Sequence, residues 1–97
     1  MIIAEAAIFP TSEGSSVSRY VKEVLRILES SGLKTQTGAM ATVIEAPDLA
    51  TLFRVIAQAD DALAAMGVGR IHIDLRVDHR LDKEASMASK LAAVGKA

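Results

Sequence analysis

The sequence has no cysteine and no tryptophan, and its aromatic side chains amount to one tyrosine and two phenylalanines. The lack of cysteine excludes disulfide bonds, thiolate metal sites and a cysteine nucleophile. The scarcity of aromatic rings argues against an RNA-binding sheet, which stacks bases on aromatic side chains of its central strands. The formal net charge of −1 gives no field that would attract nucleic acid. We therefore expect no nucleic-acid partner.

Long apolar runs are also missing from the chain. No stretch approaches the ~20 apolar residues of a membrane-spanning helix, and the first residues lack the basic segment of a signal peptide. The composition, 51% hydrophobic and 24% charged, is typical of a globular chain, and 97 residues suggest one domain that covers residues 1–97. We expect a cytoplasmic protein without a membrane partner.

The clearest pattern present is the alternation of polar and apolar residues from Arg70 to Asp78. Successive side chains of a β-strand point to opposite faces, so the alternation predicts a strand with one buried face and one polar face. In a domain of this size helices must cover the apolar side of the sheet. The polar row is then free for solvent, a ligand or another subunit.

The first third of the chain predicts a strand followed by a helix. Residues 2–9 are short and apolar and end at a proline. Residues 17–28 carry apolar side chains at i, i+3, i+4 and i+7 spacing, which indicates an amphipathic helix. Ser15 or Ser16 is suited to the N-cap, and Gly32 is suited to the C-terminal stop.

The rest of the sequence predicts two strands and one helix before the alternating strand, and one short helix after it. Residues 34–45 are best divided into two strands that turn near Gly38. Asp48 can cap a helix whose apolar stripe runs through residues 49–66. Asp82 could cap a third, short helix at the C-terminal end.

This order of elements is that of a ferredoxin-like βαββαβ sandwich with an extra C-terminal helix. The fold is α+β, with an antiparallel sheet of strand order 4-1-3-2 and helices on one face. The first and last strands are then neighbours, which places Glu5 near the polar row of the alternating strand. Opposite charges on neighbouring strands contribute roughly 0.2–1 kcal/mol each, so we expect an open face that is balanced in charge.

The spacing of polar residues indicates neither a catalytic nor a metal site. His72 and Asp74 share a strand face, but a metal needs three or four converging ligands. The glycine and serines at 14–16 could bind an anion, although helix capping explains them more simply. Glu5 and Glu45 could act as an acid–base pair only if they share a face, which the alternation leaves open. We expect no enzyme, no metal and no cofactor.

Several short motifs follow one another along nearly the whole chain. They are Ile3-Ala4-Glu5, Ile8-x-Pro10, Gly14-Ser15-Ser16-x-Ser18-x-Tyr20-Val21, Ser31-Gly32-Leu33-Lys34, Met40-x-Thr42-x-Ile44-Glu45 and Asp78-x-Arg80-x-Asp82-Lys83. Each motif alone is weak, but their succession resembles the small thiamine-binding protein family. Members of that family are single-domain ferredoxin-like proteins related to tandem-domain binders of thiamine and its hydroxymethylpyrimidine moiety.

The resemblance implies a homo-oligomer, either a dimer or a tetramer built from dimers. It also implies a non-enzymatic role in binding thiamine or hydroxymethylpyrimidine, a small-molecule partner. Carboxylate, hydroxyl and amide groups would bind the aminopyrimidine ring. The candidate ligand-binding residues are Glu5, Ser15, Ser16, Gln36, Met40, Thr42 and Glu45.

The apolar or aromatic surface that a thiamine ring needs has few possible sources in this sequence. Met40, Tyr20 and Phe9 are the candidates, and a ring stacked on both sides would need residues from two subunits. Met40 is explained equally well by packing beneath an oligomer partner and by a role in a ligand wall. The alternative function is therefore a self-association or protein-interaction module that uses the open sheet face and binds no small molecule.

Overall fold

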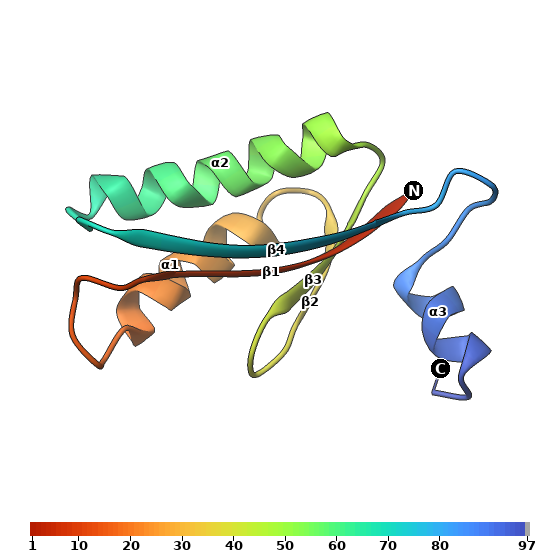
Figure 1. Cartoon of the computed structure of the whole chain (residues 1–97), viewed down its shortest axis with the longest axis horizontal. Coiled ribbons are helices and arrows are strands. Elements are labelled where there is room, and N and C mark those ends of the chain that lie inside the picture. The colour runs from red at the N-terminus through yellow and green to blue at the C-terminus, as the bar shows by residue number, and fades with distance from the viewer. Residues whose placement is uncertain (97) are drawn as a thin grey trace.

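A computed structural model describes residues 1–96 of the chain, and Figure 1 shows the arrangement of its elements. The elements follow the order that the sequence predicts. Their bounds are β1 Ile2–Pro10, α1 Ser18–Glu29, β2 Lys34–Thr37, β3 Thr42–Ala46, α2 Leu49–Ala65, β4 Ile71–His79 and α3 Met87–Ala93.

The strands form one antiparallel sheet in the order β2-β3-β1-β4. This order is 4-1-3-2 counted from the other edge, so the predicted α+β ferredoxin-like fold is confirmed. The register places Gln36, Val43, Glu5 and Arg76 opposite one another in one row across the four strands. Within the described residues, no helix is both long enough and apolar enough to span a membrane.

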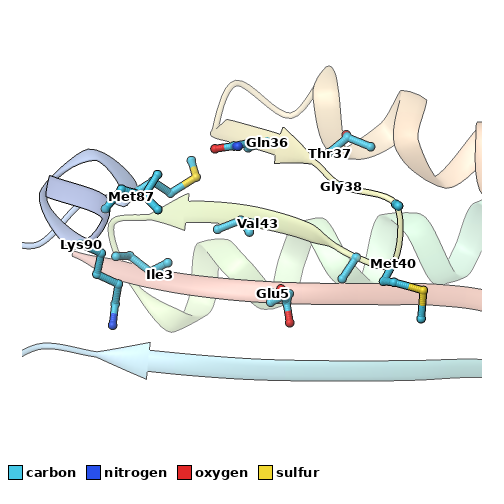
Figure 2. A pocket seen from close by; sticks show the side chains of 12 residues that line it. Ile3, Glu5, Gln36, Thr37, Gly38, Met40, Val43, Met87 and Lys90 are labelled. Atoms are coloured by element: carbon cyan, nitrogen blue, oxygen red, sulfur yellow. The ribbon is translucent and has the colours of Figure 1, made fainter. Parts of the chain in front are cut away.

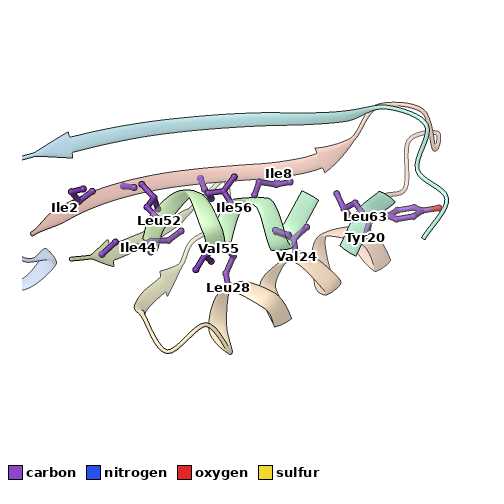
Figure 3. Close-up of a cluster of buried hydrophobic side chains, with 14 of the residues drawn as sticks. Ile2, Ile8, Tyr20, Val24, Leu28, Ile44, Leu52, Val55, Ile56 and Leu63 are labelled. Atoms are coloured by element: carbon purple, nitrogen blue, oxygen red, sulfur yellow. The ribbon is translucent and has the colours of Figure 1, made fainter. Parts of the chain in front are cut away.

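The hydrophobic core lies between one face of the sheet and the helices α1 and α2 (Figure 3). Every second residue of β1 points into it, because strand side chains alternate between faces. Ile2, Leu28, Ile44, Leu52 and Leu63 are its largest fully buried side chains. Burial of one such side chain contributes about 1.5–3 kcal/mol, so this layer holds the sheet and both helices together.

The predicted start of α1 is wrong, whereas the predicted stop is confirmed. Val17 occupies the N-cap position without a side-chain cap. Ser15 and Ser16 precede it in an exposed loop, too early in the chain to accept from the first turn of the helix. Gly32 follows the helix with φ of +84°, a conformation that glycine adopts without steric cost.

The predicted start of α3 is also wrong. Ser86 caps this helix through a capping box with Ser89, and the helix begins at Met87. Asp82 instead accepts two hydrogen bonds from the Arg80 guanidinium, at 2.7 and 2.9 Å. An immediate partner within the charged turn therefore occupies the carboxylate that was expected to cap the helix.

The helix α3 lies at one end of the sheet face opposite α1 and α2. The Met87 backbone N–H donates to the Glu45 carboxylate at 2.6 Å, and Lys90 forms an ion pair with Asp78 at 2.7 Å. Both acceptors belong to the open face, because Glu45 and Asp78 lie directly opposite Ile3 in the sheet. The expectation of helices on one face thus holds for α1 and α2, while α3 covers part of the other.

Candidate functional site

A pocket of about 500 Å³ lies on the open face of the sheet. Figure 2 shows it bounded by α3 at one end and by the turn between β2 and β3 at the other. This volume lies within the range of small-molecule sites in proteins. Its lining consists of Ile3, Glu5, Gln36, Thr37, Gly38, Ala39, Met40, Ala41, Val43, Met87, Lys90 and Leu91.

Strand alternation and register determine which side chains form the floor of the pocket. Glu5 of β1 lies opposite Val43 of β3, which lies opposite Gln36 of β2. Residues directly opposite on neighbouring antiparallel strands point to the same face, so these three side chains all point to the open face of the sheet. Ile3 lies two residues from Glu5 on the same face and extends the floor toward α3.

The polar groups of the pocket differ in how firmly they are held. The Glu5 carboxylate is half-exposed and lies 3.8 Å from the exposed Arg76 guanidinium. A pair of this kind contributes little to stability, which leaves Glu5 free to change partners. Lys90 is held more closely, since its ammonium donates to Asp78 and holds the pKa of that carboxyl below its usual value. The site thus offers one available carboxylate near its centre and a paired cation at its edge.

Two methionines supply polarizable apolar surface at the two ends of the pocket. Met87 is buried against the sheet, whereas Met40 is 89% exposed in the turn. A thioether packs well against an aromatic ring and adapts its shape to it. None of the lining residues is aromatic. Met40 and Met87 are therefore the surfaces that a heteroaromatic ring would meet.

The aromatic candidates from the sequence lie elsewhere in the fold. Tyr20 is buried in the core, and its hydroxyl donates to Glu13 at 3.0 Å. Phe9 lies on the open face at the far end of β1, with its ring centroid 5.0 Å from that of His72. Neither ring lines the pocket, so of the three expected apolar surfaces it contains Met40 alone.

The structure brings together three of the candidate ligand-binding residues, Glu5, Gln36 and Met40. Thr42 points to the helix side of the sheet, where it is 3% exposed and lines a smaller cavity of about 200 Å³. Its neighbour Val43 points into the pocket, and alternation requires Thr42 to point away. The carboxylates of Glu5 and Glu45 share the open face, which answers the question that the sequence left open.

The other candidates have different surroundings. Glu45 binds the first turn of α3 through the Met87 N–H. Ser15 and Ser16 are exposed in the loop before α1, and they line neither the pocket nor the three smaller cavities of about 200, 340 and 310 Å³. His72 and Asp74 form a pair at 3.2 Å, and residues 1–96 contain no group of three potential metal ligands.

Sequence reasoning missed the contribution of α3 to the site. Met87, Lys90 and Leu91 all line the pocket, and their i, i+3, i+4 spacing places them on one helix face. That spacing indicates a shared face but not the surface on which the helix docks. Ile3 and Val43 could have been found, because alternation from Glu5 and the strand pairing place them on the same side.

The model of the thiamine-binding protein family matches residues 4–95. The chain belongs to this family. Two relatives of similar length are the UPF0045 protein MJ1052 of Methanocaldococcus jannaschii and the UPF0045 protein YqgV of Bacillus subtilis. The first is 36% identical over 97% of this chain and 92% of its own length. The second is 38% identical over 99% of this chain and 96% of its own length.

Solved structures resemble this thiamine-binding family member over nearly its whole length. The crystal structure of MJ1052 matches with a TM-score of 0.88 and covers 99% of this chain and 97% of that one. A candidate thiamine biosynthesis or salvage protein from Thermotoga maritima matches with a TM-score of 0.82 at 14% identity, and covers 96% and 97% of the two chains. The second likeness establishes the fold alone.

Proposed function

We propose that this protein binds thiamine or its hydroxymethylpyrimidine moiety in the pocket on the open sheet face. The observation that carries the proposal is the convergence of a weakly paired carboxylate, an amide and two thioethers in a cavity of about 500 Å³. Family membership supports the same ligand class. The experiment that tests the proposal is a calorimetric titration with thiamine, its phosphates and hydroxymethylpyrimidine.

The chemistry of the ligand matches the distribution of groups in the pocket. An aminopyrimidine ring carries both hydrogen-bond donors and acceptors, which the Glu5 carboxylate and the Gln36 amide can satisfy. Thiamine also has a cationic thiazolium ring, and a carboxylate such as Glu5 favours a nearby positive charge. The methionines Met40 and Met87 would contact the ring faces.

The proposed role is binding without catalysis. We do not expect Glu5 and Glu45 to act as an acid–base pair, because Glu45 accepts from the Met87 backbone while Glu5 lies beside Arg76. General acid–base catalysis needs two such groups within reach of the same substrate atoms. This arrangement supports a carrier, storage or sensing role.

We include in the proposal a homo-oligomeric assembly, a dimer or a tetramer, and a cytoplasmic location. The exposure of Met40 supports assembly, since a large apolar side chain on a turn gains by being covered. Measurement of the mass in solution tests the first part, and cell fractionation tests the second.

The decisive variant for the ligand is Glu5→Gln, which keeps the shape of the side chain and removes its charge. We expect the affinity for thiamine to fall on the order of 10- to 100-fold, because hydrogen bonds to charged groups contribute roughly 1.5–3 kcal/mol. Glu23→Gln is the matched control, because Glu23 lies on α1 and pairs with Arg26 outside the pocket. We expect the control to bind like the wild type.

The alternative function, self-association through the open face without a small ligand, makes a different prediction. It requires that none of the titrated compounds binds below millimolar concentration. It also requires that Met40→Lys, which places a charge on the exposed turn, lowers the mass of the assembly. That combination of results would replace the proposed function, whereas ligand binding that Glu5→Gln weakens would support it.

A further inference from the structure

A cavity of about 340 Å³ adjoins the pocket on the open face of the sheet. Its lining comes from β1, β4 and α3, together with Val43 of β3. The pocket and the adjoining cavity meet along a common border, because they share the lining residues Ile3, Glu5, Val43 and Lys90. A ligand in the pocket can therefore extend past Glu5 toward β4.

Two cations and two carboxylates surround the adjoining cavity. Arg76 lies opposite Glu5 across the pair of strands β1 and β4, and Asp78 lies opposite Ile3. The ammonium of Lys90 reaches Asp78 from α3 at 2.7 Å. Figure 2 shows the charged ends of Glu5 and Lys90 on the side of the pocket that faces β4. The adjoining cavity is thus a charged extension of a pocket whose other lining residues are uncharged.

The pair between Glu5 and Arg76 is the weaker of the two ion pairs. The Arg76 side chain is 86% exposed, and its guanidinium lies 3.8 Å from the Glu5 carboxylate, which is beyond hydrogen-bond distance. A ligand cation that binds Glu5 would replace this partner and leave the guanidinium without a counter-charge. The two positive charges would then repel each other unless the ligand also carries an anion that reaches Arg76.

We propose that the adjoining cavity is a phosphate subsite, and that the site as a whole prefers a phosphate monoester of thiamine to thiamine itself. The inference rests on the proposed function, because it is the thiazolium ring that would occupy Glu5. Arg76 would bind two phosphate oxygens with its planar guanidinium, the geometry in which arginine recognises phosphate. Lys90 would add a hydrogen bond, because an ammonium has three donors and Asp78 accepts from only one of them.

The carboxylate of Asp78 limits the negative charge that the subsite can accept. It lines the same cavity, and its pair with Lys90 holds its pKa below the usual value, so it stays ionised at neutral pH. A phosphate monoester carries a charge of about −1.5 to −2 at pH 7, which Arg76 and Lys90 can match together. A diphosphate brings more negative charge, and the described residues that line the cavity offer no third cation. We therefore expect the monoester to bind more tightly than the diphosphate as well.

Calorimetric titration of the wild type with thiamine, thiamine monophosphate and thiamine diphosphate tests the preference. We expect the monophosphate to bind on the order of 10-fold more tightly than thiamine, because charge-assisted hydrogen bonds are about twice as strong as neutral ones. Equal or weaker binding of the monophosphate, with thiamine itself bound, would overturn the phosphate subsite and leave the proposed function intact. Binding of none of the three compounds would overturn both.

Two other phosphate compounds separate the contribution of the thiazolium ring from that of the phosphate. Inorganic phosphate has no ring, and hydroxymethylpyrimidine phosphate has no thiazolium. We expect both to bind more weakly than thiamine monophosphate, because neither brings a permanent cation to Glu5. If either compound binds as tightly as thiamine monophosphate, the cation at Glu5 contributes nothing and the proposed preference is wrong.

The variant Arg76→Gln removes the guanidinium on which the subsite depends. We expect the affinity for thiamine monophosphate to fall on the order of 10-fold, and the affinity for thiamine to rise, because the guanidinium no longer repels the thiazolium cation. Arg76→Lys keeps the charge without the planar fork and should retain part of the preference. Arg54→Gln, which removes the same charge from the exposed surface of α2, is the matched control and should bind both compounds like the wild type.

The ratio of the two affinities distinguishes phosphate binding from a structural role of Arg76. A structural role would lower the affinities for thiamine and thiamine monophosphate by the same factor in Arg76→Gln. An unchanged ratio in this variant would therefore contradict the proposal, whereas a ratio that falls toward one would support it.

Discussion

The Glu45 carboxylate binds the first turn of α3 and thereby determines the shape of the pocket. Its 2.6 Å hydrogen bond from the Met87 N–H joins residues that are 42 positions apart in the sequence. A carboxylate at a helix N-terminus satisfies a backbone N–H group that the helix itself leaves unpaired. Glu45 was a candidate ligand residue from the sequence, but in the structure it binds the Met87 backbone and is not among the residues that line the pocket.

Replacement of Glu45 by alanine should therefore release α3 from the sheet. We expect faster hydrogen exchange at Lys90, whose N–H donates to the Ser86 carbonyl at 3.0 Å within this helix. Thiamine affinity should fall with it, because Met87, Lys90 and Leu91 leave the pocket wall. The control is Glu84→Ala, an exposed glutamate before the same helix. Unchanged exchange at Lys90 in Glu45→Ala would show that other contacts hold α3.

At the scale of elements, the helices differ in how firmly the sequence defines their first residue. Asp48 caps α2 by accepting from the Thr51 N–H at 2.7 Å, as predicted. The serines before α1 do not cap it, because Val17, the first residue of the apolar stripe, takes the N-cap position and the helix begins at Ser18. A cap is predictable where one capping side chain precedes the stripe, and uncertain where several polar residues compete.

The Asp48 cap predicts a dependence of stability on pH. Its hydrogen bonds from Thr51 hold the pKa of the carboxyl below its ordinary value of 3.8. A pKa that is lower in the folded state adds stability that is complete well above 3.8 and is lost as the pH falls through the folded value. We expect wild type to melt above Asp48→Asn at pH 6, and the difference to shrink at pH 3.

Thermal unfolding at the two pH values measures this difference directly. Asparagine caps helices about as well as aspartate, so the variant changes the charge while keeping the hydrogen-bond acceptor. Asp61→Asn removes a carboxylate from the body of the same helix and is the control for general charge effects. A difference between wild type and Asp48→Asn that is equal at both pH values would contradict the interpretation.

At the scale of the whole molecule, the sheet separates three surfaces. One face holds the core with α1 and α2, the other holds the pocket and α3, and β4 forms an open edge (Figure 1). None of the side chains that line the pocket belongs to the core cluster.

This separation predicts that the pocket can be changed without loss of stability. Glu5→Gln alters a half-exposed side chain on the face away from the core, so its melting temperature should lie within about 4 °C of the wild type. Thermal unfolding of the two proteins checks this. A much larger drop would show that the Glu5 carboxylate is needed for the fold itself.

The sequence alone was sufficient for the fold and for the polar character of the open face. Strand alternation from Arg70 to Asp78, the apolar stripes of α1 and α2 and the stop at Gly32 are local patterns, and a local pattern follows from the geometry of one element. Glu5 and Gln36 lie in one row because strand pairing in this fold brings β1, β3 and β2 side by side, and Met40 lies in the turn that joins β2 to β3.

The tertiary structure decided what local patterns cannot encode. The position of α3 depends on contacts such as Glu45 with Met87, which are distant in sequence and need both elements in place. The same contacts give Glu45 a structural partner, while the register of β3 turns Thr42 toward the core. Which side chains line the pocket was therefore decided by packing, because a helix face specifies what it can bury and not where it docks.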